Sequence, residues 1–341
     1  MKRIVAAEFG GPEVLRVTEE DDPRPAPGEV RIRVEAAGVS FTDTLIRAGT
    51  YLSGPKPPFT PGYEVVGVVD ELGPGCSRLH QGDRVAALLV WGGYAEQVCV
   101  AEAKAVRVRH DLDPAELVSL AFPYMTAYQL IHRVSKARPG ETVLVHGAAG
   151  RVGTAVLELG ALAGLRLYGT ASTADCELVE RFGAVAIDRS REDFLARVRE
   201  LTGKGVDVAL DGFGGMLSIR SFRALGPGGR LVVFGHYSTI SDGRKSRRGW
   251  IAWYASTACV GLAGLISPRR KVLAYRIAKL RDRHPDWFHD DLGALAELTR
   301  DGRIHPIVAE RLPLEDARRA HELLERSASK GRLVLVPSAR R

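Results

Sequence analysis

A glycine-rich turn directly after an apolar run constrains the fold of this chain more than any other feature. Residues 146–153 read HGAAGRVG and follow the apolar run Thr142–Val145. A turn of this kind, placed between a buried strand and a helix, presents backbone N–H groups and the positive end of the helix dipole to a phosphate. We therefore expect a strand, a phosphate-binding turn and a helix in this region.

Strand and helix patterns alternate after this turn at the spacing of βαβ units. Helical patterns at Gly153–Ala163 and Arg191–Leu201 lie between the apolar runs. The six predicted strands are Thr142–His146, Arg166–Thr170, Ala184–Ile187, Val206–Asp211, Arg230–Gly235 and Thr257–Gly264. Six strands in this arrangement are typical of a doubly wound nucleotide-binding sheet.

The first 120 residues carry short strand patterns instead, separated by proline and glycine turns. The patterns occur at Glu29–Val34, Tyr63–Val69 and Asp83–Leu88, and they suggest a small β-barrel. Residues 114–134 are predicted to be helical and to lead into the βα series.

The segment after residue 267 is expected to fold back onto the barrel. Its predicted elements are the helices Lys271–Arg283, Asp291–Arg300 and Leu314–Arg326 and the strand Arg332–Val336. The predicted fold class is α/β, with a discontinuous barrel domain at 1–122 and 267–341 and a nucleotide-binding domain at 123–266.

The turn also matches the dinucleotide-binding fingerprint, with alanine in the place of the first glycine. Its second glycine lets the backbone approach a pyrophosphate, and its third lets the helix pack closely on the strand. The predicted cofactor contacts here are Ala148, Gly150, Arg151, Val152 and Gly153.

The end of the second strand distinguishes NAD from NADP. Residues 168–172 read YGTAS, without the acid that binds the ribose hydroxyls of NAD. Ser172 would not repel a 2′-phosphate, and Arg189 after the third strand is the candidate cation. A solvent-facing role for Arg189 stays open, and the nearby acid Asp175 argues against the phosphate, but NADP(H) is the predicted cofactor.

Residues 250–266 (WIAWYASTACVGLAGLI) form the most apolar segment. The segment is shorter than a typical spanning helix, so we predict no membrane span and expect a buried strand with a preceding aromatic loop. The alternative is an exposed face that meets a partner subunit, an apolar substrate or a membrane surface.

Charge and cysteine usage set the expected compartment and partners. The four cysteines are scattered without a CxxC pair, and the N-terminus shows no signal pattern, which favours the cytoplasm. The net charge is +7, with one basic cluster at 244–248. A solvated loop is expected there, and nucleic-acid binding is disfavoured because no aromatic residues are interleaved with the charges.

Several motifs follow one another over nearly the whole chain. They are GVSFTD at 38–43, PGYEVVG at 61–67, GDRV at 82–85, GGYAE at 92–96, TAY at 126–128, HGAAGRVG at 146–153, GRI-x-P at 302–306 and KGRLVL at 330–335. With these motifs the chain resembles the medium-chain dehydrogenase/reductase superfamily, in particular its zinc-free quinone oxidoreductase branch, which includes the zeta-crystallin-like proteins.

The resemblance implies a GroES-like β-barrel catalytic domain and a Rossmann domain, with the active site in the cleft between them. It also implies a homodimer joined through the last Rossmann strand, which would give Thr257–Gly264 a reason to be apolar.

The resemblance also has departures. Zinc-dependent members of the superfamily place metal ligands where this chain has Ser40, Tyr63 and Phe122, and these residues cannot make a thiolate and imidazole site. No metal is therefore predicted. The zinc-free branch usually carries asparagine at the Ser40 position and a lysine after the second strand, and both are absent. Arg189 replaces a family tyrosine and could compensate for that lysine.

The implied chemistry is hydride transfer from NADPH to a small, apolar, electrophilic substrate. The candidate catalytic residues are Tyr51, Tyr63, Ser40 and Asp43. The further cofactor contacts are Thr126, Phe234, Gly235 and His236. Tyr51 as an ordinary packed tyrosine and Asp43 as a helix cap are the alternatives for those two residues.

The function predicted from the sequence is therefore a zinc-independent, NADPH-dependent reductase of a quinone or an α,β-unsaturated carbonyl compound. Two alternatives stay open. One is an alkenal or enoyl-thioester reductase, and the other is a catalytically idle NADPH-binding protein with a structural, RNA-binding or vesicle-associated role.

Overall fold

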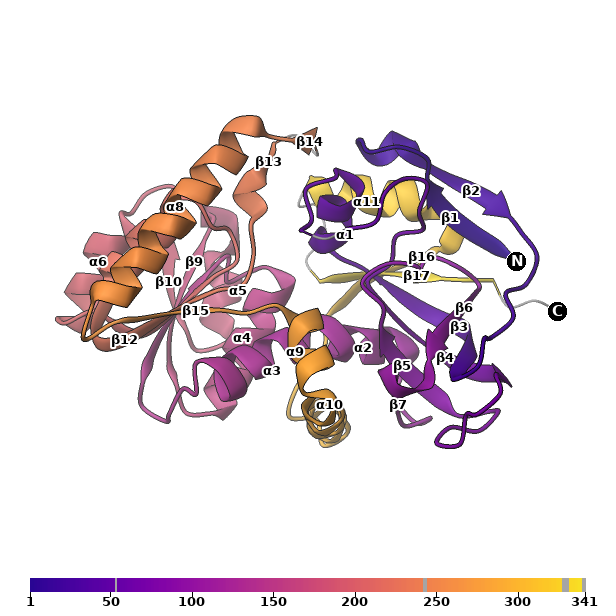
Figure 1. Cartoon of the computed structure of the whole chain (residues 1–341). Helices are drawn as coiled ribbons and strands as arrows, with labels where there is room; N and C mark the ends of the chain where they lie inside the picture. The colour runs from indigo at the N-terminus through magenta and orange to yellow at the C-terminus, as the bar shows by residue number, and fades with distance from the viewer. Residues whose placement is uncertain (53, 242–243, 327–330, 339–341) are drawn as a thin grey trace. The chain divides into compact units, whose positions relative to one another are not determined.

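The computed structural model describes residues 1–341 except 53, 242–243, 327–330 and 339–341 (Figure 1). Lys330, in the last of the sequence motifs, lies outside the described residues. The chain divides into two compact units, each with its own sheet and core. Unit 1 comprises Met1–Met125, Asp242–Lys245 and Arg281–Arg341, and unit 2 comprises Thr126–Ser241 and Ser246–Leu280.

Unit 2 contains a six-stranded parallel sheet in the order β10-β9-β8-β11-β12-β15. Its strands are β8 (Thr142–His146), β9 (Arg166–Ala171), β10 (Val185–Asp188), β11 (Val206–Asp211), β12 (Leu225–Val233) and β15 (Lys271–Ala274). The central strands are apolar along their whole length because helices cover both faces of such a sheet. All strands predicted between Thr142 and Gly235 are present, although β12 begins five residues before the predicted Arg230 and ends at Val233.

The described part of unit 2 contains seven α-helices, and several of them pack on this sheet. They are α3 (Met125–Gln129), α4 (Arg151–Leu162), α5 (Cys176–Arg181), α6 (Phe194–Thr202), α7 (Met216–Ala224), α8 (Arg247–Ile266) and α9 (Ile277–Arg283). Val198 of α6, Ala224 of α7 and Val260 of α8 share one hydrophobic cluster with Leu144 and Leu231 of the sheet. These three helices therefore cover the same face.

The strand predicted at Thr257–Gly264 is wrong. The segment belongs to α8, a helix of 20 residues. A continuous apolar run can form a buried strand or a helix, and this run is too long for a strand and rich in alanine and leucine, which favour helices.

The sixth strand of the sheet is β15 instead, so the helix predicted at Lys271–Arg283 is also wrong in its first half. Lys271–Ala274 pairs in parallel with β12, and only Ile277–Arg283 is helical. The sheet thus continues past the expected domain boundary at residue 266. The dimer contact inferred for Thr257–Gly264 loses its basis, because that segment is not a strand.

Unit 1 contains a seven-stranded sheet in the order β16-β17-β3-β4-β5-β7, with β6 also pairing with β3, and a separate β1-β2 hairpin. Its strands are β1 (Lys2–Ala6), β2 (Leu15–Glu19), β3 (Glu29–Val39), β4 (Glu64–Leu72), β5 (Arg84–Leu88), β6 (Gln97–Ala101), β7 (Ala105–Arg107), β16 (Val308–Pro313) and β17 (Arg332–Val336). The C-terminal strand β17 pairs antiparallel with β3, so the end of the chain joins the N-terminal sheet as expected.

The helices of unit 1 are short except for α10. They are α1 (Phe41–Arg47), α2 (Pro114–Ser119), α10 (Pro285–Arg300) and α11 (Ala317–Glu325). A π-helical turn at Leu120–Tyr124 joins α2 to α3, within the segment that the sequence predicts to be helical.

Candidate functional site

The turn between β8 and α4 is shaped by its glycines. Gly147 has φ +66°, a left-handed conformation that favours glycine. Gly150 caps α4 without any side-chain hydrogen bond, and its N–H donates to the carbonyl oxygen of Gly147 at 2.9 Å. A Cβ at Gly153 would overlap the carbonyl oxygens of Gly147 and Ala148. The backbone thus folds into a tight cradle at the N-terminus of α4.

A buried histidine supports this turn from below. His146 Nδ1 lies 3.1 Å from Thr170 Oγ1, and His146 Nε2 lies 2.9 Å from Ser221 Oγ. Thr170 Oγ1 also accepts the N–H of Gly147 at 3.3 Å. Burial lowers the pKa of His146 to about 4, so the ring is neutral near pH 7. Sequence reasoning missed His146, although a histidine at the last position of an apolar strand is a signal for such a role.

Three of the predicted cofactor contacts are buried or partly buried residues of unit 2. Arg151 is the first residue of α4, and burial lowers the pKa of its guanidinium to about 10, so it stays protonated at neutral pH. Thr126, at the start of α3, is buried, and its Oγ1 has no hydrogen-bond partner among the described residues. Ala148 is buried, and its N–H donates to Thr170 O at 3.0 Å.

The hydroxyl of Ser172 and the carboxylate of Asp175 lie together at the end of β9. Ser172 Oγ donates to Asp175 Oδ2 at 2.6 Å. The exposed Arg189 is tied to the same strand end, because its backbone N–H donates to Ala171 O at 3.0 Å. Hydrogen bonds from Ser190 lower the pKa of Asp188 to about 2. A cation and two carboxylates therefore lie around this strand end.

The segment after β12 places His236 beside the start of α8. Phe234 N–H donates to Asp211 O at 2.9 Å, and a Cβ at Gly235 would overlap the backbone of Gly212. The ring of His236 lies 5.8 Å from that of Trp253. The expected aromatic residues of α8 thus form a cluster around His236.

In unit 1, Ser40 and Asp43 close the N-terminus of α1. Ser40 Oγ accepts the N–H of Asp43 at 3.2 Å, and Asp43 Oδ2 accepts the backbone N–H of Ser40 at 2.8 Å. Asp43 Oδ1 also accepts the N–H of Gly62 at 3.1 Å. Burial raises the pKa of Asp43, and the hydrogen bonds from Ser40 oppose that shift. The geometry matches the capping alternative considered for Asp43.

The structure brings together the two tyrosines predicted for catalysis. Tyr51 Oη and Tyr63 Oη are 2.9 Å apart. The ring of Tyr63 is buried and packs on Phe122, with the ring centroids 4.6 Å apart. The phenol of Tyr63 is therefore held in place by a ring contact on one side and a hydrogen bond on the other.

A buried ion pair braces the same region. Arg332 of β17 pairs with Glu64 of β4, and both side chains are buried. A Cβ at Gly38 would overlap this pair, which explains the glycine of the GVSFTD motif. The sequence does not reveal this ion pair, because the partners are far apart along the chain.

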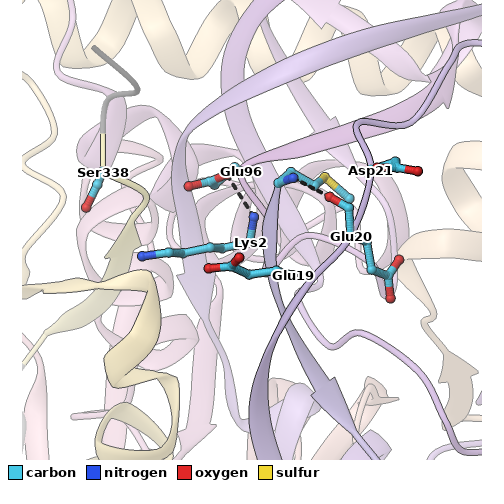
Figure 2. Close-up of a pocket in the computed structure, with 7 residues that line it drawn as sticks. Lys2, Glu19, Glu20, Asp21, Glu96 and Ser338 are labelled. Carbon is cyan, nitrogen blue, oxygen red and sulfur yellow. Dashed lines mark hydrogen bonds between the residues drawn. The ribbon is translucent and has the colours of Figure 1, made fainter.

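Figure 2 shows a pocket elsewhere in unit 1. It is lined by Met1, Lys2, Glu19, Glu20, Asp21, Glu96 and Ser338. The N–H of Lys2 donates to Glu96 Oε2 at 2.8 Å. None of the predicted site residues lines this acidic pocket, and it plays no part in the site described above.

Comparison with known proteins gives the family. The model of the alcohol dehydrogenase GroES-like domain matches residues 26–110, and the model of the zinc-binding dehydrogenase matches residues 182–335. The quinone oxidoreductase of Rattus norvegicus is 31% identical over 98% of this chain and 98% of its own length. The chain belongs to the quinone oxidoreductase branch of the medium-chain dehydrogenase/reductase superfamily. It is an oxidoreductase with a GroES-like domain and a Rossmann domain, which confirms the predicted fold class.

Solved structures of this branch have the same fold. The quinone oxidoreductase of Escherichia coli, complexed with NADPH, has a TM-score of 0.87 and 30% identity, and the match covers 99% of this chain and 100% of that one. A further relative of this oxidoreductase is the synaptic vesicle membrane protein VAT-1 homolog of Rattus norvegicus. It is 29% identical over 99% of this chain and 84% of its own length.

Proposed function

We propose that this oxidoreductase uses NADPH to reduce a quinone or an α,β-unsaturated carbonyl compound, without zinc. One observation carries the proposal. Tyr63 stands at a position where zinc-dependent relatives are expected to hold a metal ligand, and here its phenol forms a hydrogen bond with Tyr51. A fixed phenol pair can donate a hydrogen bond to an oxygen atom but provides no thiolate or imidazole for zinc.

The cofactor half of the proposal rests on unit 2. When bound, NADPH would supply a hydride from its nicotinamide ring. The cradle at Gly150 and Gly153 would receive the pyrophosphate at the open N-terminus of α4. Arg189 would bind the 2′-phosphate. The hydroxyl of Thr126, which has no partner among the residues that the structure describes, would bind the nicotinamide end. The complex of the Escherichia coli relative with NADPH supports this choice of cofactor.

The substrate half rests on the tyrosine pair of unit 1. Negative charge develops on the carbonyl oxygen of a quinone or an enone as it accepts hydride, and a fixed donor stabilises that charge. Tyr63 would orient Tyr51 for this role, because Tyr63 is itself immobilised against Phe122. Ser40 and Asp43 would act as positioning residues, since their polar atoms are engaged in capping α1.

The residues at the positions of the zinc ligands in zinc-dependent relatives argue against a bound metal. Ser40 is engaged with Asp43, Tyr63 with Tyr51, and Phe122 has no donor atom. Among the described residues, no group of three or more histidine, cysteine, aspartate or glutamate side chains could hold a metal ion. We therefore expect activity to persist after dialysis against a zinc chelator, and a loss that added zinc restores would contradict the proposal.

The central test is NADPH oxidation with a panel of quinones and 2-alkenals. We expect turnover with at least one class, and Tyr51→Phe should lower kcat by about tenfold or more while NADPH affinity stays unchanged. Tight NADPH binding without turnover of any quinone or enone would contradict the proposed enzymatic activity. Turnover with 2-alkenals or enoyl thioesters alone would assign the rival reductase activity.

The cofactor preference has its own test. Arg189→Ala should weaken NADPH about tenfold and leave NADH nearly unchanged, because only NADPH carries the 2′-phosphate. Arg181→Ala is the matched control, since Arg181 is also exposed and lies at the end of α5. Equal losses for both cofactors would refute the phosphate role of Arg189.

The assembly and the compartment are part of the same proposal. We expect a homodimer, and the edge strand β15 offers backbone groups that a second copy can pair with. All four cysteines are unpaired, which suits the cytoplasm. Sedimentation equilibrium tests the dimer.

A further inference from the structure

Helix α8 presents a long apolar face to solvent. The helix has no charged residue between Arg248 and Arg269. The side that faces the sheet is marked by the buried Ser256 and Val260. The opposite side exposes Ile251 (70%), Tyr254 (57%), Leu262 (61%), Leu265 (85%) and Ile266 (74%). Most of these residues recur every three to four positions or a multiple of that spacing, so they lie along one face about 20 Å long.

This exposure is unusual for a helix of such composition. Exposed apolar patches of this extent mark an interaction surface, whereas single exposed apolar residues need no explanation. By length and composition alone, α8 could cross a membrane, although only 11% of its apolar window is buried. The alternative considered for this segment from sequence, an exposed face, is thus the one that the structure supports.

The connections of α8 exclude a spanning orientation while the unit is folded. The helix joins β12 to β15, which are neighbouring parallel strands of one sheet. Its inner side packs on that sheet, and a Cβ at Gly264 would lie 2.6 Å from the side chain of Val272. The helix can therefore lie on a surface with its outer face, but it cannot insert across a bilayer without unfolding the sheet.

Exposed cations flank the apolar face at both ends. Arg247 and Arg248 begin the helix, and Arg269 and Lys271 follow it. None of these four has a carboxylate partner within the described part of the chain. No aspartate or glutamate occurs anywhere between Asp242 and Asp282. The face and its flanks thus combine apolar surface with uncompensated positive charge.

That charge pattern selects the occupant. If α8 packed on α8 of a second copy about a two-fold axis, basic ends would face basic ends in either a parallel or an antiparallel pair. A surface of anionic lipids meets both requirements, because acyl chains accept the apolar face and headgroup phosphates attract the flanking cations. Tyr254 near the N-terminal end suits the interfacial level of a bilayer.

We propose that α8 docks this oxidoreductase on anionic membrane surfaces, with Ile251, Tyr254, Leu262 and Leu265 at the level of the acyl chains and the flanking cations at the headgroups. The docking is peripheral and reversible, and it does not depend on the reductase activity. A membrane-docked reductase would also work where apolar quinones and alkenals partition.

The test is cosedimentation of the full chain with vesicles of phosphatidylcholine alone or of phosphatidylcholine mixed with phosphatidylserine. We expect binding to the mixed vesicles, weakened by high salt, and little binding to the neutral ones. The double variant Leu262→Asp with Leu265→Asp should lower partitioning at least about tenfold, and Arg269→Glu with Lys271→Glu should do the same.

Val17→Asp is the matched control, because Val17 is also an exposed apolar residue but lies on β2 of unit 1. Both α8 residues are exposed, so the variants should keep the circular dichroism spectrum and melting temperature of the parent chain. Equal partitioning of the parent and of both double variants would overturn the proposal, as would equal binding to neutral and anionic vesicles. A dimer that Leu262→Asp with Leu265→Asp dissociates, without any lipid binding by the parent, would assign the face to a second copy instead.

Discussion

The chain passes from a strand into a helix both between β3 and α1 and between β8 and α4. The two helix N-termini differ in whether side chains cap them. At α1, Ser40 and Asp43 satisfy the N-terminal backbone groups with their own side chains. At α4, Gly150 provides no side-chain cap, the first turn has no acid, and Arg151 places a positive charge there. An acid in the first turn would repel a bound anion, and α4 has none there.

The comparison distinguishes polar groups that stabilise the fold from polar groups that could bind a ligand. The polar side chains of Ser40 and Asp43 form hydrogen bonds that cap α1, so their presence in a motif is weak evidence for a catalytic role. The start of α4 has the opposite character, since glycine packing shapes it and its N–H groups stay available for a phosphate. Each unit also has a buried histidine: His146 lies below the α4 turn, and His321 contacts Arg47 at the C-terminal end of α1.

The largest expected effect comes from filling the α4 cradle. Gly153→Ala should weaken NADPH binding by at least about a hundredfold, because the added Cβ would force the turn away from its position. The affinity is measured by titration of cofactor fluorescence. Gly293→Ala on α10 is the control, since a Cβ there meets no atom within 4 Å and should stabilise the helix by up to about 1 kcal/mol. Unchanged affinity in Gly153→Ala would remove the cradle from the cofactor site.

Acid should lower the free energy of unfolding through the two buried histidines. Burial lowers the pKa of His146 to about 4 and that of His321 well below 6.5. The unfolded chain therefore binds protons below about pH 6.5 that the folded chain does not, and the free energy of unfolding falls as the pH drops from 6.5 towards 4. His146 alone corresponds to a loss on the order of 3 kcal/mol.

Urea unfolding at neutral pH and at about pH 5 measures this loss. His146→Gln keeps hydrogen-bonding groups near Thr170 and Ser221 but cannot titrate, so its stability should depend less steeply on pH. If the variant loses stability with the same slope as the parent chain, His146 does not contribute to the acid sensitivity.

A smaller effect is expected at the α1 cap. Ser40→Ala should lower the free energy of unfolding by about 1 kcal/mol, because the N–H of Asp43 loses its acceptor. NADPH affinity should stay the same, and Ser40→Thr should restore the stability because it keeps the hydroxyl. A loss of cofactor affinity in Ser40→Ala at unchanged stability would show that Ser40 acts on the ligand rather than on the helix.

The smallest predicted effect belongs to Thr126. Its Oγ1 has no partner among the described residues, so Thr126→Val should not lower the melting temperature. NADPH binding should weaken by roughly threefold to tenfold, the worth of one hydrogen bond. Lower stability with unchanged NADPH affinity would show that the hydroxyl serves the fold, contrary to the proposal.

Local patterns were sufficient to predict some of these elements from the sequence. The bounds of β8, β11 and β17 were predicted to the residue, because each is a short apolar run between turn residues. The glycine-rich turn between β8 and α4 was also predicted, since backbone geometry requires its glycines at that point, and its phosphate role stays a prediction. The fold class followed from the order of these patterns and from the motifs of the superfamily.

The apolar segment at 250–266 shows where local patterns were insufficient. An uninterrupted apolar run has no period that distinguishes strand from helix, so α8 and β15 were both assigned wrongly. Pairing with β12 decided that Lys271–Ala274 is the strand, and it left α8 as the crossover helix with one face exposed. The length of the run and its alanine and leucine content favour a helix, but only the pairing with β12 shows which segment is the sixth strand.

The sequence by itself determined the phosphate turn, the βα series and the replacement of the expected zinc ligands, since these depend on residue type and spacing. Only the tertiary structure decided which groups meet. Tyr51 and Tyr63 share a hydrogen bond, and Arg332 reaches Glu64 from a distant part of the chain. The hydroxyl of Thr126 finds no partner in the described part of the chain. Neither helical nor strand periodicity relates the positions of these partners, so their contacts follow from tertiary packing.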